Sequence, residues 1–112
     1  MSLTLAIVCR RLGGISEQDV LRWVAADLVR SDRHGTEMLF QEVDLSRLRL
    51  IRELRDDLQI EEETLPVVLS LLDQLHGTRR DLTRVLAAMQ RVVPSDQRDA
   101  VLRDLGIASD PN

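Results

Sequence analysis

The feature that most constrains this chain is a run of apolar residues with heptad spacing in its C-terminal half. From Val68 to Val93, apolar side chains recur in alternating steps of four and three residues. Such spacing places the side chains on one face of an α-helix and is typical of helices that pack along their length. The positions are Val68, Leu72, Leu75, Leu82, Leu86, Met89 and Val93, and Arg79 interrupts the seam. The chain is therefore expected to be mainly helical.

Gly77 lies inside this run and leaves two interpretations open. Glycine weakens a helix by about 1 kcal/mol relative to alanine, so the segment can fold back at Gly77 into an antiparallel helix pair. Alternatively, the helix continues through Gly77 and presents its seam to a second copy of the chain. We favour the long helix and predict a homodimer whose interface contains Leu75, Leu82, Leu86 and Met89.

The N-terminal part of the chain has a helix–turn–helix pattern. The apolar face of the first helix is formed by Leu5, Val8, Cys9 and Leu12. Gly13-Gly14 is expected to end this helix, because glycine readily adopts the left-handed conformation of a helix terminus. Ser16, followed by Glu17 and Asp19, is expected to cap a second helix. Its apolar stripe is Val20, Val24 and Leu28, and Trp23, beside the stripe, is expected to be partly exposed.

A hairpin and a third helix are expected next. The polar stretch from Arg30 to Gln41, with Gly35 as a turn residue, fits a small hairpin or wing. Asp44 or Ser46 is expected to cap the third helix. Its predicted core face is Leu48, Ile51, Leu54 and Leu58, widened by Leu50, and its predicted outer side carries Arg47, Arg49, Arg52 and Arg55.

Two further helices complete the expected organisation. Glu61–Glu63 fits the acidic first turn of the fourth helix, and Pro66 is tolerated near such a start. Pro94 begins a last helix that Gly106 ends, and residues 108–112 are expected to be loose. We divide the chain into a helix–turn–helix domain over 1–60, a leucine-rich dimerisation segment over 61–93, and a short helix and tail over 94–112.

Residues that carry catalysis or bind metals are sparse in this sequence. The two histidines, His34 and His76, lie far apart and lack metal-ligand spacing with Cys9, the single cysteine. Cys9 lies on an apolar face and is expected to behave as a small buried hydrophobe. We therefore expect no enzymatic activity, no cofactor and no metal. The lone cysteine and the lack of a recognisable signal peptide or apolar span favour a cytoplasmic protein.

Charge is distributed in bands along the chain. Residues 10–55 hold nine arginines and eight acids, and residues 56–76 hold six acids and no base. Residues 77–93 hold four arginines and one aspartate, and all fifteen basic residues of the chain are arginine. The central acidic band argues against general nucleic-acid binding, because phosphates require a cationic surface.

Several motifs together resemble a known family. The stretches Leu5–Cys9, Gly14–Ser16 and Leu21–Trp23, followed by the leucine-rich third helix, look like the opening of a MerR-type winged helix. A closer resemblance is to the chaperone modulatory protein CbpM family, over roughly residues 3–90. The motifs that carry it are Met38–Phe40, Arg52–Leu58, Pro66 and Val68–Leu75. The chain departs from DNA-binding MerR proteins at Val24-Ala25, where they carry Tyr-Glu, and at Leu28, where they carry glycine.

The resemblance implies a mainly α fold, with a MerR-like winged helix-turn-helix before the long or paired helix. It also implies a non-enzymatic, homodimeric regulator that binds the J-domain of a DnaJ-like co-chaperone (CbpA type) and inhibits its stimulation of Hsp70. J-domains present a basic helix, so the expected contacts are Asp56, Asp57, Glu61, Glu62 and Glu63. The alternative is a transcriptional regulator that contacts DNA through Gln18, Arg22, Arg47 and Arg49. A helical adaptor with a different partner stays open as a third interpretation.

Overall fold

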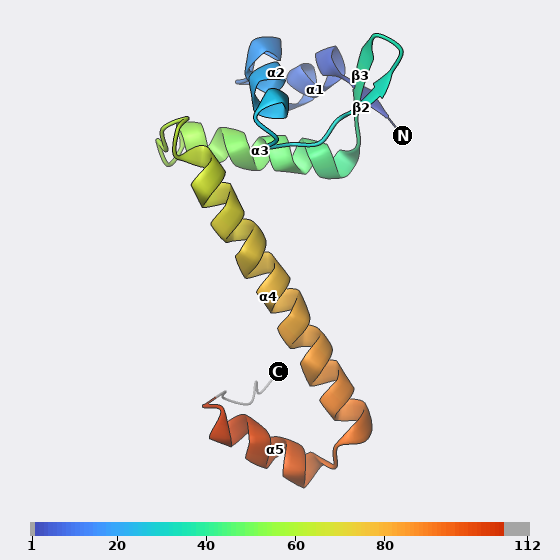
Figure 1. The fold of residues 1–112 in the computed structure, drawn as a ribbon, viewed down its shortest axis with the longest axis vertical. Helices are drawn as coiled ribbons and strands as arrows, with labels where there is room; N and C mark the ends of the chain where they lie inside the picture. Colours follow the sequence, from blue (N-terminus) through green and yellow to red (C-terminus); the bar gives the residue numbers. More distant parts are fainter. Residues whose placement is uncertain (1, 107–112) are drawn as a thin grey trace. The chain divides into compact units, whose positions relative to one another are not determined.

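A computed structural model describes residues 2–106, and these are mainly helical with a small antiparallel sheet (Figure 1). The chain divides into two compact units, one ending at Leu71 and the other beginning at Leu72. The elements are, in order, β1 (Leu3–Thr4), α1 (Leu5–Leu12), α2 (Glu17–Ala25), β2 (Asp32–His34), β3 (Glu37–Phe40), α3 (Glu42–Asp56), α4 (Leu65–Val92) and α5 (Ser95–Asp104). The prediction of a loose segment over 108–112 lies outside the described residues.

The turn between α1 and α2 confirms the predicted helix ends. Gly13 and Gly14 have φ angles of 67° and 73°, which a residue with a side chain rarely adopts. The Ser16 hydroxyl accepts from the Asp19 amide, and the Asp19 carboxylate accepts from the Ser16 amide, both at 3.0 Å. This reciprocal pair is a capping box, and it specifies where α2 begins.

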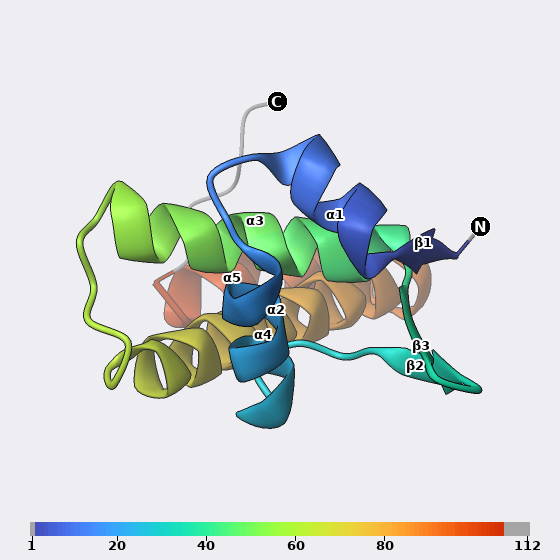
Figure 2. The same ribbon diagram turned by 90° about the horizontal axis from the view of Figure 1, so that it is seen from above.

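The predicted hairpin is present and belongs to a three-stranded sheet. β2 and β3 pair antiparallel around Gly35, which has a φ of 66°. β1 adds to the other side of β3, with Leu3 opposite Phe40, so the strand order is β1-β3-β2. β1 was not predicted, because a two-residue strand has no periodicity to read. Figure 1 shows α1 and α2 on one side of α3, and in Figure 2, viewed from that side, they lie in front of it. The first turn of α3 follows β3 directly.

The core of the first unit is aliphatic apart from Trp23 and Phe40, and the predicted exposure of Trp23 is wrong. Trp23 is completely buried. Its ring lies 5.2 Å from the Arg55 guanidinium carbon, and its indole N–H donates to Glu62 at 3.1 Å. Position 23 therefore points inward although it lies beside the stripe of α2, because distant parts of the chain cover it.

Helix α3 differs from its prediction at both ends. Neither Asp44 nor Ser46 is the cap: α3 begins at Glu42, and the buried Asp44 carboxylate accepts from the Gln41 amide at 2.8 Å. The predicted core face holds for Leu48, Ile51 and Leu54, which are buried. Leu58 is wrong, because α3 ends at Asp56 and Gln59 turns the chain with a φ of 55°. Leu58 is consequently 66% exposed.

Helix α4 is continuous from Leu65 to Val92, so the alternative in which the chain folds back at Gly77 is wrong. Gly77 is not among the glycines with positive φ and fits a helix without strain. Glu61–Glu63 do not form the first turn of α4, since they lie in the turn that precedes Leu65. The Thr64 amide there bonds to the Glu61 carbonyl at 2.9 Å. Pro66 is the second residue of α4, where no N–H is needed.

The second unit consists of most of α4 together with α5. α5 begins after Pro94 and ends before Gly106, whose φ of 74° confirms the predicted stop. None of the residues from 72 to 106 is buried. Over the described part of the chain, no helix is both apolar and long enough to span a bilayer.

Candidate partner-binding surfaces

The five acids predicted to meet a partner lie in one connecting segment of the first unit. We call residues 56–63, between α3 and α4, the acidic segment. All five residues are exposed: Asp56, Asp57, Glu61, Glu62 and Glu63. The segment is held by backbone hydrogen bonds from Leu58 to Glu53 at 3.1 Å and from Ile60 to Leu54 at 2.9 Å. The acids are therefore carried on a defined turn.

Two of these acids already have partners inside the first unit. The Glu62 carboxylate accepts from Arg22 at 2.9 Å and from the Trp23 indole at 3.1 Å. The Asp56 carboxylate accepts from Arg55 at 2.8 Å and 3.2 Å. Glu62 thus ties the acidic segment to α2, and Asp56 is neutralised by its neighbour. Among the described residues 2–106, Asp57, Glu61 and Glu63 form no such side-chain ion pair, so they carry the segment's outward charge.

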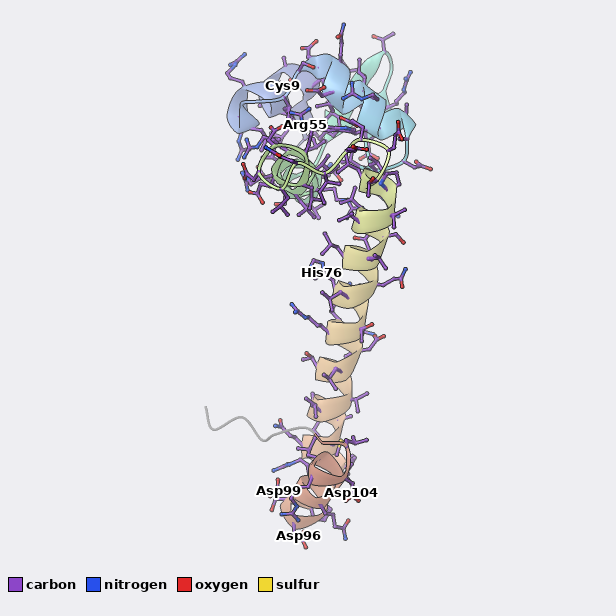
Figure 3. The ribbon with its side chains drawn as sticks, turned by 90° about the vertical axis from the view of Figure 1, so that its left-hand side faces the viewer. Cys9, Arg55, His76, Asp96, Asp99 and Asp104 are labelled. Carbon is purple, nitrogen blue, oxygen red and sulfur yellow. The ribbon has the colours of Figure 1, made fainter. Side chains whose placement is uncertain are left out.

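Asp19 is the centre of a network that joins α2 to α3. Its carboxylate lies 2.9 Å from Arg22 and 3.0 Å from Arg55. Burial alone would raise the pKa of Asp19. The hydrogen bond from the Ser16 amide, followed by those from Arg55 and Arg22, outweighs burial and holds this pKa well below its ordinary range. Arg55 is labelled in Figure 3, within the first unit. Its hydrogen bond to Asp56 raises the pKa of Arg55, and Asp19 adds to the effect.

The arginines of α3 do not all face solvent, contrary to the prediction. Arg52 donates to the carbonyls of Leu12 and Gly13, and Arg55 donates to the carbonyl of Gly14 at 3.0 Å. The end of a helix leaves carbonyls without intrahelical partners, and these guanidinium groups satisfy them. Arg52 and Arg55 are half-buried and act as ties between α3 and the turn after α1.

The four residues of the alternative DNA surface differ in their surroundings. Arg22 is paired with Asp19 and Glu62, and Arg47 donates to the Leu28 carbonyl at 2.9 Å. Gln18 on α2 and Arg49 on α3 are exposed. Two of the four side chains are thus engaged within the first unit, and contact with phosphate or base would require them to exchange partners.

Leu58 is the surface residue that the sequence analysis missed. It is a large apolar side chain, 66% exposed, on the turn that carries the acids. Asp56 and Asp57 precede it, and Glu61 follows the turn. An exposed apolar side chain surrounded by charge is the usual anatomy of a small protein interface. No signal in the sequence marks this exposure, because Leu58 continues the helical spacing of Leu54 and has polar residues on both sides.

The predicted dimer residues lie on the second unit and are accessible. Leu75 and Leu82 are exposed, and Leu86 and Met89 are half-buried. All four lie within the single helix α4. The seam is therefore available to another chain along its length.

The lone thiol is not poised for nucleophilic chemistry. Cys9 is half-buried. Burial raises its pKa, and the negative charges of Glu17 and Asp19 raise it further. Among the described residues, no three His, Cys, Asp or Glu side chains are grouped so as to hold a metal ion.

Comparison with known proteins adds no relative: no protein-family model matches the chain, and no curated protein matches it either. The features that bear on function are therefore the surfaces of the molecule. Two are notable, the acidic segment around Leu58 and the apolar seam of α4.

Replacing Asp19 by asparagine tests the network and its pH dependence. The folded-state pKa lies below the ordinary value of 3.8, so ionised Asp19 stabilises the fold above that pH and loses this effect as the pH falls. We expect Asp19→Asn to lower the free energy of unfolding by about 1–2 kcal/mol at neutral pH. The variant should also lose less of its remaining stability than wild type on acidification below pH about 4.

Chemical denaturation at a series of pH values measures both effects. Asp27→Asn is the matched control, because Asp27 is exposed at a φ of 62° that asparagine also tolerates. Equal stability of the Asp19 and Asp27 variants at neutral pH would show that the network does not stabilise the fold.

Proposed function

We propose that this chain is a non-enzymatic modulator that binds the J-domain of a DnaJ-like co-chaperone. It binds through the acidic segment and blocks the surface by which the J-domain stimulates Hsp70. The observation that carries the proposal is Leu58, exposed on a defined turn and accompanied by the outward charges of Asp57, Glu61 and Glu63.

The charge and apolar centre of this surface favour a cationic partner. Carboxylates attract a cationic surface and orient it during encounter. The apolar centre supplies contact area from which water is excluded on binding. The resemblance to the CbpM family names such a partner, since J-domains present a basic helix. A partner with an apolar side chain between lysines or arginines would meet Leu58 and the acids together.

The first unit also supports a narrower proposal about its fold. Two helices joined by a capped turn, followed by a β-hairpin, are the elements of a MerR-like winged helix-turn-helix. We propose this fold for residues 2–60. DNA binding does not follow from it, because Arg22 and Arg47 are engaged within the unit and the acidic segment repels phosphate.

The modulator is proposed to act as a homodimer through α4. An in-register parallel pair would bring the two Arg79 side chains together in the seam. An antiparallel pair can instead place Arg79 opposite Met89, so that Leu82 faces Leu86 and the charged end of Arg79 reaches solvent. Like-charge repulsion therefore favours the antiparallel arrangement.

Reversing two of the outward charges should abolish most of the inhibition. We expect Glu61→Arg combined with Glu63→Arg to raise the concentration needed to inhibit J-domain-stimulated Hsp70 ATPase activity by roughly ten- to a hundredfold. Both residues are exposed, so folding should be unaffected, as far-ultraviolet circular dichroism would check.

The matched control is Glu17→Arg combined with Glu37→Arg, two exposed acids outside the acidic segment. This control changes the net charge equally and should inhibit as wild type does. If both double variants lose inhibition to the same extent, the effect belongs to net charge rather than to the acidic segment. If neither loses it, the partner binds elsewhere.

A further inference from the structure

The second unit presents more apolar surface than its own chain covers. None of its described residues, 72–106, is buried. Large apolar side chains are exposed along both of its helices. They are Leu75, Leu82, Val85, Val92, Val101 and Leu105. A stable fold rarely leaves so many large apolar side chains in water, so another surface is expected to cover them.

The apolar surface of α4 is wider than the seam of a two-stranded coiled coil. Val85 lies three residues after Leu82, and Val92 lies three residues after Met89. Both therefore lie beside the seam rather than on it. Val92 is 78% exposed. A helix with apolar residues at the seam and at one flanking position meets more than one neighbouring helix. A second copy of α4 alone would leave this flank uncovered.

Helix α5 has the properties of the missing neighbour. Val101 and Leu105 are exposed, and Leu102 between them is half-buried, so the helix presents apolar surface outward. α5 also carries three aspartates, labelled in Figure 3, against two arginines. Residues 77–93 of α4 carry four arginines against one aspartate. The two helices are therefore complementary in charge as well as in apolar character.

We propose that α5 of each chain packs against the flank of α4 of a second copy. The pair of chains then forms a four-helix bundle from two α4 and two α5 helices. The inference rests on the proposed homodimer and adds α5 to its interface. A bundle buries the seam and the flank together, which a two-stranded coiled coil cannot do.

Sedimentation equilibrium of the full chain tests this inference. We expect Val101→Asp to weaken dimerisation by roughly ten- to a hundredfold, because it places a charge in the buried contact. Gln97→Asp introduces the same residue at an exposed polar position of α5 and should leave the dissociation constant unchanged. Hydrogen exchange gives a second readout: α5 amides should be protected in the dimer and lose that protection in a monomeric Leu82→Asp variant.

The outcomes separate the two claims. If Val101→Asp dimerises as wild type does while Leu82→Asp is monomeric, α5 is not in the interface and the α4 dimer stands. Protection of α5 that persists in the monomer would also overturn the inference. A wild-type chain that is monomeric at tens of micromolar would remove the homodimer and the bundle together.

Discussion

We expect Leu82→Asp to convert the chain from a dimer into a monomer. Leu82 lies near the middle of the α4 seam and is 45% exposed in the single chain. A twofold dimer contains the substituted position twice, so one change introduces two charges into the contact. Burying an unpaired carboxylate costs several kcal/mol, and the dissociation constant should rise by roughly a hundredfold or more.

Ala87→Asp is the control for this experiment. Ala87 is exposed and lies five residues beyond Leu82, away from the seam, and the substitution changes the charge by the same amount. Sedimentation equilibrium should find this variant dimeric. Dimerisation of Leu82→Asp with wild-type affinity would show that the predicted seam is not the interface.

The second large effect concerns the core of the first unit. Trp23→Ala should lower the free energy of unfolding by about 3–5 kcal/mol, because it removes the largest buried side chain and leaves a cavity. It also takes the ring away from Arg55 and the N–H donor away from Glu62. A unit of about 70 residues has only a modest free energy of unfolding, so this loss is large.

Denaturation should be followed by circular dichroism, because Trp23 is the only tryptophan and its fluorescence is lost with it. Trp23→Phe keeps an aromatic ring but removes the N–H donor. Its free energy of unfolding should therefore fall by about 1 kcal/mol beyond the loss due to the smaller ring. A loss below about 1 kcal/mol for Trp23→Ala would contradict the position of this residue in the core.

The sequence predicted those features that depend on near neighbours. Ser16 and Asp19 cap α2 through contacts three residues apart, and Gly13, Gly35 and Gly106 lie where the chain must turn. Such signals are local, so they can be read without knowing the rest of the fold. The hairpin and the long helix were predicted for the same reason.

Features that depend on distant contacts were predicted poorly. Trp23 is covered by Arg55 and Glu62, which lie more than thirty positions away in the sequence. The expected solvent side of α3 was wrong for Arg52 and Arg55, which satisfy carbonyls at the end of α1. Helical periodicity also extended the core face to Leu58, one turn beyond Leu54 but two residues past the end of α3.

The candidate site was located in part. The sequence placed five acids in one segment, but it did not distinguish Glu62 and Asp56, which are paired, from Asp57, Glu61 and Glu63. It also assigned Leu58 to the core. The partner of Glu62, Arg22, lies forty positions earlier in the chain, and spacing along the sequence does not show such a contact.

Titration of a purified J-domain from a DnaJ-like co-chaperone into the wild-type chain tests the central claim most directly. Isothermal calorimetry at low salt should give a saturable signal with a micromolar dissociation constant and one J-domain bound per chain. Affinity should fall in about 0.5 M salt, where the attraction between exposed charges is screened. Absence of binding at tens of micromolar J-domain would contradict the proposed function, and binding of equal strength at both salt concentrations would contradict the role of the acidic segment.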